Sequence, residues 1–323
     1  MSTRLTETLV FVTFQYKLPR ISSEEALHHF QAGELPENDQ EWHRLVPPEA
    51  RDALGKKEVQ RQSVIFEVIK SEREYVADLE AVEHVRLLSW KSRSPGALIL
   101  FSKVFIEGLR TAEPPIIREP RLSEYINEVF GNLRDILFHH RRILAALFAR
   151  QRDQHPLIQS VADIILDSKL VYNLTNDALV HIIVEATLKS DFRSAYETYI
   201  KHYPLAESLH RKQLKTNRAY EVFILSVSTD PRIRKRDLVT FLSRPVTKLP
   251  RLNLLLEQTL KLTDIEHDHP DIETLPIILG ILKDCIKSTQ PGIEAAESKV
   301  KFWALCESLV FQNGEIIVSL FMP

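Results

Sequence analysis

The chain has 323 residues, with 42 Lys and Arg against 44 Asp and Glu, and it contains only eight Gly. Average usage would give roughly 23 Gly at this length, and no two of the eight lie within ten residues of each other. Loops that cradle phosphates need clustered glycines, so that backbone N–H groups can approach the anion. We therefore exclude P-loop, Rossmann and kinase-type nucleotide sites. Scarce Gly also argues against turn-rich β-sandwiches and barrels, and we expect a mostly helical fold.

The near-neutral net charge and the two cysteines further limit the class of protein to which the chain can belong. The net charge is −2 and the pI is about 6.7, so no overall field attracts nucleic acid or acidic lipid. Cys285 and Cys306 are too few for a disulfide framework and too isolated for a zinc site, which favours a reduced, cytoplasmic protein. The longest apolar runs, 9–14 and 97–101, are far shorter than the roughly 20 residues that span a bilayer. We expect any membrane contact to be peripheral.

Seventeen prolines suggest where the elements begin and end, because Pro disfavours helix at and before its position. Residues 1–57 form a mixed N-terminal extension. A long amphipathic helix follows, in which apolar residues recur at spacings of three and four from Ile65 to Val82. Further helices are predicted at 122–152, 156–170, 175–188, 190–216, 218–228, 245–262 and 271–289.

The C-terminal residues carry a different signal. After Pro291-Gly292 we expect one short helix, and then two strands within 302–321 joined at Asn313-Gly314. Asn-Gly between β-branched and aromatic runs is a strong hairpin signal. The sequence therefore predicts the beginning of a second module over residues 290–323.

The candidates for covalent or metal chemistry are weak. His267 and His269 form an H-x-H pair without an evident third ligand, and solvated loop histidines explain them better. His139 and His140 are adjacent on a helix, point in divergent directions and are interpreted as structural. Cys285 has lysines nearby that could lower the pKa of its thiol, but a buried structural thiol is favoured. We expect no cofactor, no metal and no covalent catalysis.

A basic segment between Arg232 and Arg251 is more informative. It contains seven cationic residues and one acid, Asp237. Arg244, Lys248 and Arg251 are spaced by four and three, so a helix would place them on one face. A solvated face, an acidic protein partner and nucleic acid are the alternatives. Nucleic acid is disfavoured, because the segment has one aromatic residue and the chain as a whole is not basic.

Two segments resemble the conserved segments of Dbl-homology domains. The first, 56–79, has the form E-(apolar)2-x2-E-x2-Y-V-x2-L beginning at Glu67. The second, 242–257, resembles (K/R)-P-(V/I)-x-(K/R)-(apolar)-x-(K/R)-Y-P-L-L-L, with Leu-Asn in place of Tyr-Pro. Residues 129–133 resemble a middle segment, and 42–47 are most similar to fungal Rho-type exchange factors of the cell-wall-integrity kind.

The resemblance covers about 58–289 and implies an elongated all-α bundle. It implies a guanine-nucleotide exchange factor that binds a Rho-family GTPase, stabilises its nucleotide-free state and accelerates GDP release without covalent chemistry. In that family a pleckstrin-homology domain follows, so 290–323 would be a linker helix and the start of a truncated pleckstrin-like module. Such a module implies peripheral recruitment to the inner face of the plasma membrane. Because an insertion near 87–103 interrupts the family pattern, a scaffold or interaction module without exchange activity is the alternative.

The resemblance also implies which residues contact the GTPase. Glu67 matches the family's glutamate that contacts the first switch segment, and Arg251 matches the Lys/Arg that reaches the second. Lys248 is expected at the rim of the same surface, beside Arg244. Lys287 occupies a position in the last long helix where the family commonly carries Asn.

Three consecutive leucines follow Arg251. We interpret Leu254, Leu255 and Leu256 as core and support rather than as contact residues.

Overall fold

The regular elements of the protein are helices. The computed structural model describes residues 23–83, 105–166, 191–230, 233, 235–264 and 269–309, and within them every regular element is helical. In chain order the elements are α1 (Ser23–Ala32), the 3-10 turn η1 (Glu37–Asp39), α2 (Trp42–Leu45), α3 (Pro48–Asp52), α4 (Lys56–Glu83), α5 (Ile106–Thr111), α6 (Arg121–Phe130), α7 (Leu133–Gln154), α8 (Ala162–Ile165), α10 (Arg193–Thr216), α11 (Arg218–Ser228), α12 (Leu238–Leu242), α13 (Arg244–Leu262) and α14 (Asp271–Ser308).

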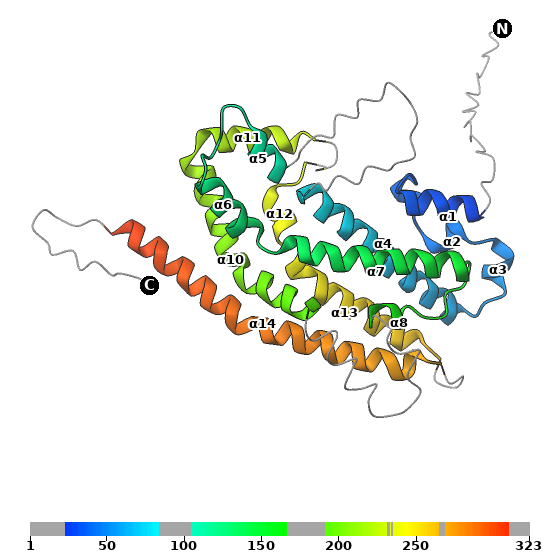
Figure 1. Cartoon of the computed structure of the whole chain (residues 1–323). Coiled ribbons are helices and arrows are strands. Elements are labelled where there is room, and N and C mark those ends of the chain that lie inside the picture. The colour runs from blue at the N-terminus through cyan, green and yellow to red at the C-terminus, as the bar shows by residue number, and fades with distance from the viewer. Residues whose placement is uncertain are drawn as a thin grey trace, which may run out of the picture.

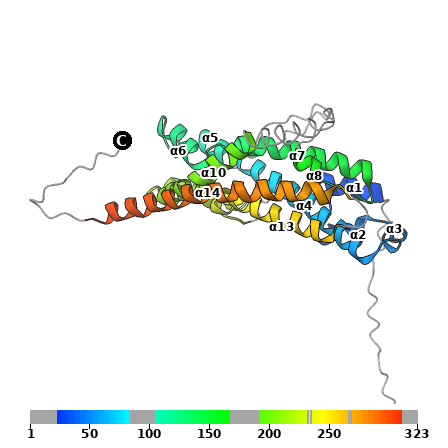
Figure 2. The same ribbon diagram turned by 90° about the horizontal axis from the view of Figure 1, so that it is seen from below.

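The long helices pack side by side into an elongated bundle. Helix α4 packs against both α7 and α13, while α13 also contacts α14, and α14 packs along α10. Figures 1 and 2 show α1, α2 and α3 gathered at one end and α5 and α6 at the other. Helix α11 lies beside α5 and α6 (Figure 1). The C-terminal end of α14 projects beyond the rest of the bundle (Figure 1). This arrangement agrees with the all-α bundle that the sequence predicts.

Helix α4 is the central element, and its sequence explains why. The predicted apolar stripe is buried in full, with Ile65, Ile69 and Leu79 each 0% exposed. Burying a side chain of this size stabilises the fold by about 1.5–3 kcal/mol, so the stripe fixes which face of α4 turns inward. The remaining face of α4 is left for polar contacts with α13 and solvent.

The predicted helix over 122–152 is two helices, α6 and α7. Gly131 separates them with φ 51° and ψ −137°, a conformation that residues with a Cβ rarely adopt. Asn132 follows it, and its side-chain amide donates to the carbonyl oxygen of Ala195 on α10. The prediction of one helix was wrong because an amphipathic pattern can continue across a break of this kind.

The prediction that α14 ends before Pro291 was also wrong. The helix continues through Pro276 and Pro291 to Ser308, because burial of its inner face outweighs the roughly 3 kcal/mol that an internal Pro costs. Gly292 permits this packing: a Cβ at that position would lie 2.3 Å from Cγ of Lys201 on α10. The glycine therefore allows a close helix–helix approach rather than ending a helix.

The predicted strands near the C-terminus are corrected in part. Residues 302–308 are helical. Once a helix has formed, each further residue that becomes ordered gains a hydrogen bond, so extending a helix is easier than starting one. The Asn313-Gly314 turn lies outside the described residues, as do the predicted helix 175–188 and the predicted insertion 87–103. Of the predicted helix 156–170, the described part forms only the single turn α8. No helix in the described ranges is long and apolar enough to span a membrane.

Candidate functional site

Helices α4 and α13 run antiparallel and are joined by ion pairs at successive turns. As residue numbers rise along α13, those of their partners fall along α4. The three pairs, which we call the α4–α13 ladder, are Arg244–Asp78 at 2.6 Å, Lys248–Glu72 at 2.6 Å and Arg251–Glu67 at 2.7 Å. The ladder contains four of the expected contact residues: Glu67, Arg244, Lys248 and Arg251. These four side chains differ greatly in how deeply they are buried.

The pair at the exposed end of the ladder joins the two principal predicted residues. Arg251 Nη2 lies 2.7 Å from Glu67 Oε1, and the two side chains are 50% and 38% exposed. An ion pair with this much solvent access contributes about 0–1 kcal/mol to stability. Both groups can therefore be redirected towards a partner at little cost to the fold.

We expect Lys248 at the rim of the surface, but the structure buries it. Its side chain is 5% exposed, and its ammonium lies against Glu72 and over the ring of Tyr75. The prediction was wrong because the inner positions of α13 face α4, and a residue one turn from an exposed Arg can still point inward. Arg244 is also largely covered, since its guanidinium pairs with the buried carboxylate of Asp78.

Lys287 lies on α14, outside the ladder. It is exposed and follows by one turn Lys283, whose ammonium pairs with Glu257 of α13 at 2.7 Å. The structure thus places Lys287 on α14, which packs against α13 and α10. It makes no ion pair with Glu67, whose partner is Arg251.

Leu254, Leu255 and Leu256 do not act alike. Leu256 is 0% exposed and Leu255 is partly buried, but Leu254 is 65% exposed. The expectation that all three support the core was wrong for Leu254. The inward positions of α13 recur at three- and four-residue spacing and include Leu252, Asn253 and Leu256, which turns Leu254 to the opposite face.

A buried polar cluster extends inward from Glu72. His140 Nδ1 lies 2.5 Å from a Glu72 oxygen and His140 Nε2 lies 2.6 Å from the hydroxyl of Tyr196, which also contacts the hydroxyl of Tyr75 at 3.1 Å. His140 donates from Nδ1 to the carboxylate of Glu72, and its Nε2 shares a second hydrogen bond with the hydroxyl of Tyr196. All four helices α4, α7, α10 and α13 contribute to this cluster.

The pKa of Glu72 shows how the cluster balances its charges. Burial is the largest effect and raises the pKa, but the charges and hydrogen bonds of His140 and Lys248 together outweigh it. The pKa falls from its usual 4.5 to about 2, so the carboxylate stays ionised inside the bundle. Glu72 was not singled out from the sequence, although a carboxylate on an otherwise apolar stripe signals a buried charge that needs a partner.

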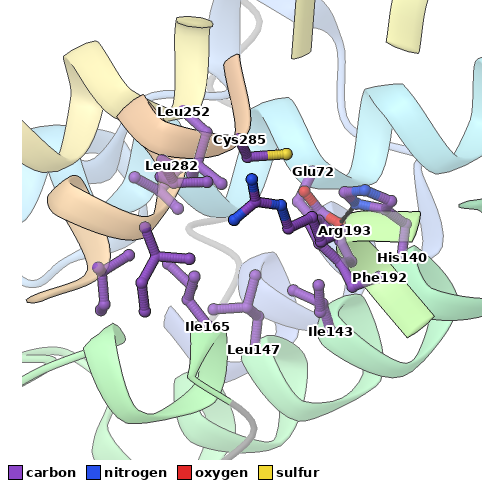
Figure 3. A pocket seen from close by; sticks show the side chains of 13 residues that line it. Glu72, His140, Ile143, Leu147, Ile165, Phe192, Arg193, Leu252, Leu282 and Cys285 are labelled. Atoms are coloured by element: carbon purple, nitrogen blue, oxygen red, sulfur yellow. Dashed lines mark hydrogen bonds and ion pairs between the residues drawn. The ribbon is translucent and has the colours of Figure 1, made fainter. Parts of the chain in front are cut away.

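A cavity adjoins the cluster (Figure 3). Its polar end is formed by Glu72, His140 and Arg193, and the rest of its lining is mainly aliphatic and aromatic. Cys285 also lines it, and burial raises the pKa of this thiol to about 11, so it is a poor nucleophile at neutral pH. The thiol is buried, as the sequence analysis favoured.

The remaining histidine candidates have structural partners where they are described. His269 Nε2 contacts the guanidinium of Arg61, and its Nδ1 accepts from the backbone N–H of Asp271. His267 lies outside the described residues. No group of three or more potential metal ligands occurs in the part of the chain that the structure describes.

The family model of the RhoGEF domain matches residues 64–290. Among curated proteins, the chain is 28% identical over 266 residues to Rho1 guanine nucleotide exchange factor 3 of Schizosaccharomyces pombe, covering 82% of this chain and 18% of that protein. It is 26% identical over 292 residues to RHO1 GDP-GTP exchange protein 2 of Saccharomyces cerevisiae, covering 88% of this chain and 18% of the relative. The chain thus spans about a fifth of the length of these relatives.

Solved structures show the same fold. The DH/PH domains of PDZ-RhoGEF, solved in complex with GTP-γ-S-activated RhoA, match with a TM-score of 0.62 at 15% identity, over 81% of this chain and 61% of theirs. The DH/PH domains of p115-RhoGEF match with a TM-score of 0.61 at 17% identity, over 87% of this chain and 65% of theirs. The ladder between α4 and α13 therefore lies within a helical bundle of known type.

Proposed function

The chain belongs to the RhoGEF domain family, and from this we propose that it is a guanine-nucleotide exchange factor for a Rho-family GTPase. The observation that carries the proposal is the exposed Glu67–Arg251 pair, within the span matched by the family model. The named fungal relatives, Rho1 exchange factors in two yeasts, support the same partner class.

Exchange requires recognition rather than bond formation. An exchange factor accelerates nucleotide release when it binds the nucleotide-free GTPase more tightly than the nucleotide-bound form, which is differential binding applied to a dissociation step. The released site then fills with GTP because GTP is abundant. Glu67 and Arg251 supply one negative and one positive group on adjacent helices, and each is free to exchange its internal partner for a group on the GTPase.

The other predicted contact residues take different roles in this proposal. Lys248, paired with Glu72 inside the bundle, positions α13 rather than touching the GTPase. Arg244 supports the same helix through Asp78. Lys287, exposed on α14, would contribute charge at the edge of the surface.

We propose residues 58–289 as the exchange domain, preceded by an extension over 1–57 and followed by a linker and the start of a pleckstrin-like module over 290–323. Two free cysteines in the described structure support a reducing, cytoplasmic location. Peripheral contact with the inner face of the plasma membrane through the C-terminal module completes the proposal.

The test is release of a fluorescent GDP analogue from a panel of Rho-family GTPases. We expect the wild-type protein to accelerate release from at least one member. Losing one charge pair at a desolvated interface costs about 2–5 kcal/mol, so Glu67→Ala and Arg251→Glu should each slow exchange by roughly 30-fold or more. Folded, soluble protein that accelerates release from no member of the panel would instead support the scaffold alternative.

A stability measurement separates loss of recognition from loss of fold. Because the Glu67–Arg251 pair is exposed, each substitution should change the free energy of unfolding by no more than about 1 kcal/mol. Full exchange activity in either variant would show that the assigned surface is wrong even if the function is right.

A further inference from the structure

The cavity shown in Figure 3 lies directly beneath the exposed end of the ladder. Val68 and Leu252 line it, and they are the chain neighbours of Glu67 and Arg251, which form the exposed ion pair. The other lining residues come from α4 itself and from α7, α8, α10 and α14. The cavity therefore lies where six helices meet, and the proposed exchange mechanism does not use it.

The walls of this cavity are apolar and its volume is small. Leu147, Ile165 and Leu282 are buried side chains from three different helices, whereas Ile143 and Ile281 are only partly buried and mark where the cavity approaches the surface. Counted for the centre of a water molecule, the volume is about 30 Å³, and one water needs roughly 10–15 Å³ on this measure. The cavity therefore has room for two or three waters, or for one molecule of about five or six heavy atoms.

One polar side chain enters the cavity with hydrogen-bond donors to spare. Arg193 donates from Nε to Glu197 at 2.6 Å, and its two terminal Nη groups donate to no other described residue. Figure 3 shows this guanidinium reaching across the cavity towards Cys285, whose sulfur is only a weak acceptor. An oxygen atom inside the cavity would therefore meet open N–H donors.

The charges around the cavity decide what kind of oxygen fits. Arg193 is already neutralised by Glu197, and Lys248 is neutralised by Glu72, whose ionised carboxylate lies at the same end of the cavity. A ligand carboxylate would lose its hydration among apolar walls and would lie beside a like charge. A neutral oxygen avoids both costs and still accepts from Arg193.

We propose that this cavity is a binding site for a small neutral molecule with an apolar body and one carbonyl oxygen, and that this oxygen accepts a hydrogen bond from the Arg193 guanidinium. Small-molecule sites commonly combine apolar walls with a few well-placed polar groups in this way. The site is independent of the proposed exchange function. Its occupant lies between Val68 and Leu252 and so packs directly under the exposed ion pair.

The experiment is a titration of the whole protein, carrying labelled Ile, Leu and Val methyl groups, followed by NMR. Three probes are compared: cyclopentanone, cyclopentane as the same ring without oxygen, and butyrate as an anion with as many heavy atoms as cyclopentanone. We expect cyclopentanone to shift the methyl signals of Leu147, Ile165 and Leu282 together, with one Kd in the millimolar range that so few atoms allow. It should bind at least about threefold more tightly than either of the other probes.

Substitution of Arg193 tests the hydrogen bond itself. In Arg193→Leu the preference for cyclopentanone over cyclopentane should disappear, whereas Arg193→Lys, which keeps a donor, should retain part of it. The matched control is Arg211→Leu, because Arg211 lies on the same helix and pairs with Glu207 at 2.6 Å but does not line the cavity. This control should keep the full preference.

Three results would each overturn the inference. The first is no shift of the three methyl signals at 50-fold excess over a millimolar Kd (roughly 50 mM cyclopentanone). The second is equal or tighter binding of cyclopentane or butyrate by the wild type, a comparison that needs no variant to fold. The third is an equal loss of preference in Arg193→Leu and Arg211→Leu.

Discussion

Replacing Glu72 with glutamine removes the negative charge at the buried end of the ladder while nearly preserving the shape of the side chain. In the folded protein this carboxylate contacts Lys248 Nζ at 2.6 Å and His140 Nδ1 at 2.5 Å, and it is only 3% exposed. The substitution leaves the Lys248 ammonium buried without a counter-ion. A buried charge deprived of its partner costs about 3–5 kcal/mol.

The lowered pKa of Glu72 gives a second, independent value for the stability that this carboxylate contributes. Its pKa is lowered from 4.5 to about 2 in the folded protein, which corresponds to about 3 kcal/mol of stability at neutral pH. Because the folded pKa is depressed, this contribution is complete above about pH 4.5 and is lost as the pH falls towards 2. At pH 3, about 2 kcal/mol of it should already be gone.

The assay is urea denaturation followed by circular dichroism at several pH values. The matched control is Glu67→Gln, the same chemical change on the same helix opposite an exposed partner, which should cost no more than about 1 kcal/mol. We expect Glu72→Gln to be about 3–5 kcal/mol less stable than wild type at pH 7, and the difference to narrow towards pH 3. Equal losses in the two variants, or a difference that does not change with pH, would refute the argument.

Three further predictions follow from particular residues. In a Glu67→Arg, Arg251→Glu double variant the internal pair is restored with its polarity reversed, so thermal stability should match wild type while exchange stays lost; recovered exchange would count against direct contact with the GTPase. Gly131→Ala should lower stability by about 1–3 kcal/mol in a thermal melt, because its backbone has φ 51°, and an unchanged melting temperature would contradict this. Only one thiol should react quickly with a thiol reagent at pH 7.5, since Cys306 is exposed and Cys285 is buried with its pKa raised to about 11; two fast thiols would show that the bundle opens at α14.

Residues whose position depends on local periodicity were predicted well. The apolar stripe of α4 is visible in the sequence, because a helix that buries one face repeats its apolar residues at a fixed spacing. Glu67 lies off this stripe, and the structure leaves it partly exposed. The same logic fails for α14, where packing against α10 carries the helix through Pro291 despite a strong local breaker signal.

Where the burial of a residue depends on packing against a second helix, it could not be predicted from the sequence. The spacing of Arg244, Lys248 and Arg251 predicts one shared face, but only the packing of α4 decides how much of that face is covered. It covers Lys248 almost completely and leaves Arg251 half exposed. His140 is a similar case: its apolar neighbours on α7 suggest a buried ring, but its partners Glu72 and Tyr196 are 68 and 56 residues away in the chain.

The ion pairs of the ladder are chemically similar, but they differ in burial, and burial decides whether a pair serves stability or recognition. The deep pair cannot give up its partner without leaving a charge buried, so it holds α4 and α13 in a fixed relation. The exposed pair contributes little to stability, so its charges are available to a binding partner, which we propose is a GTPase. An exchange factor needs both properties, because deformation of its own surface subtracts from the binding energy that would displace the nucleotide. Substitutions at Glu72 should therefore reduce exchange through the fold, whereas substitutions at Glu67 should reduce it with the fold intact.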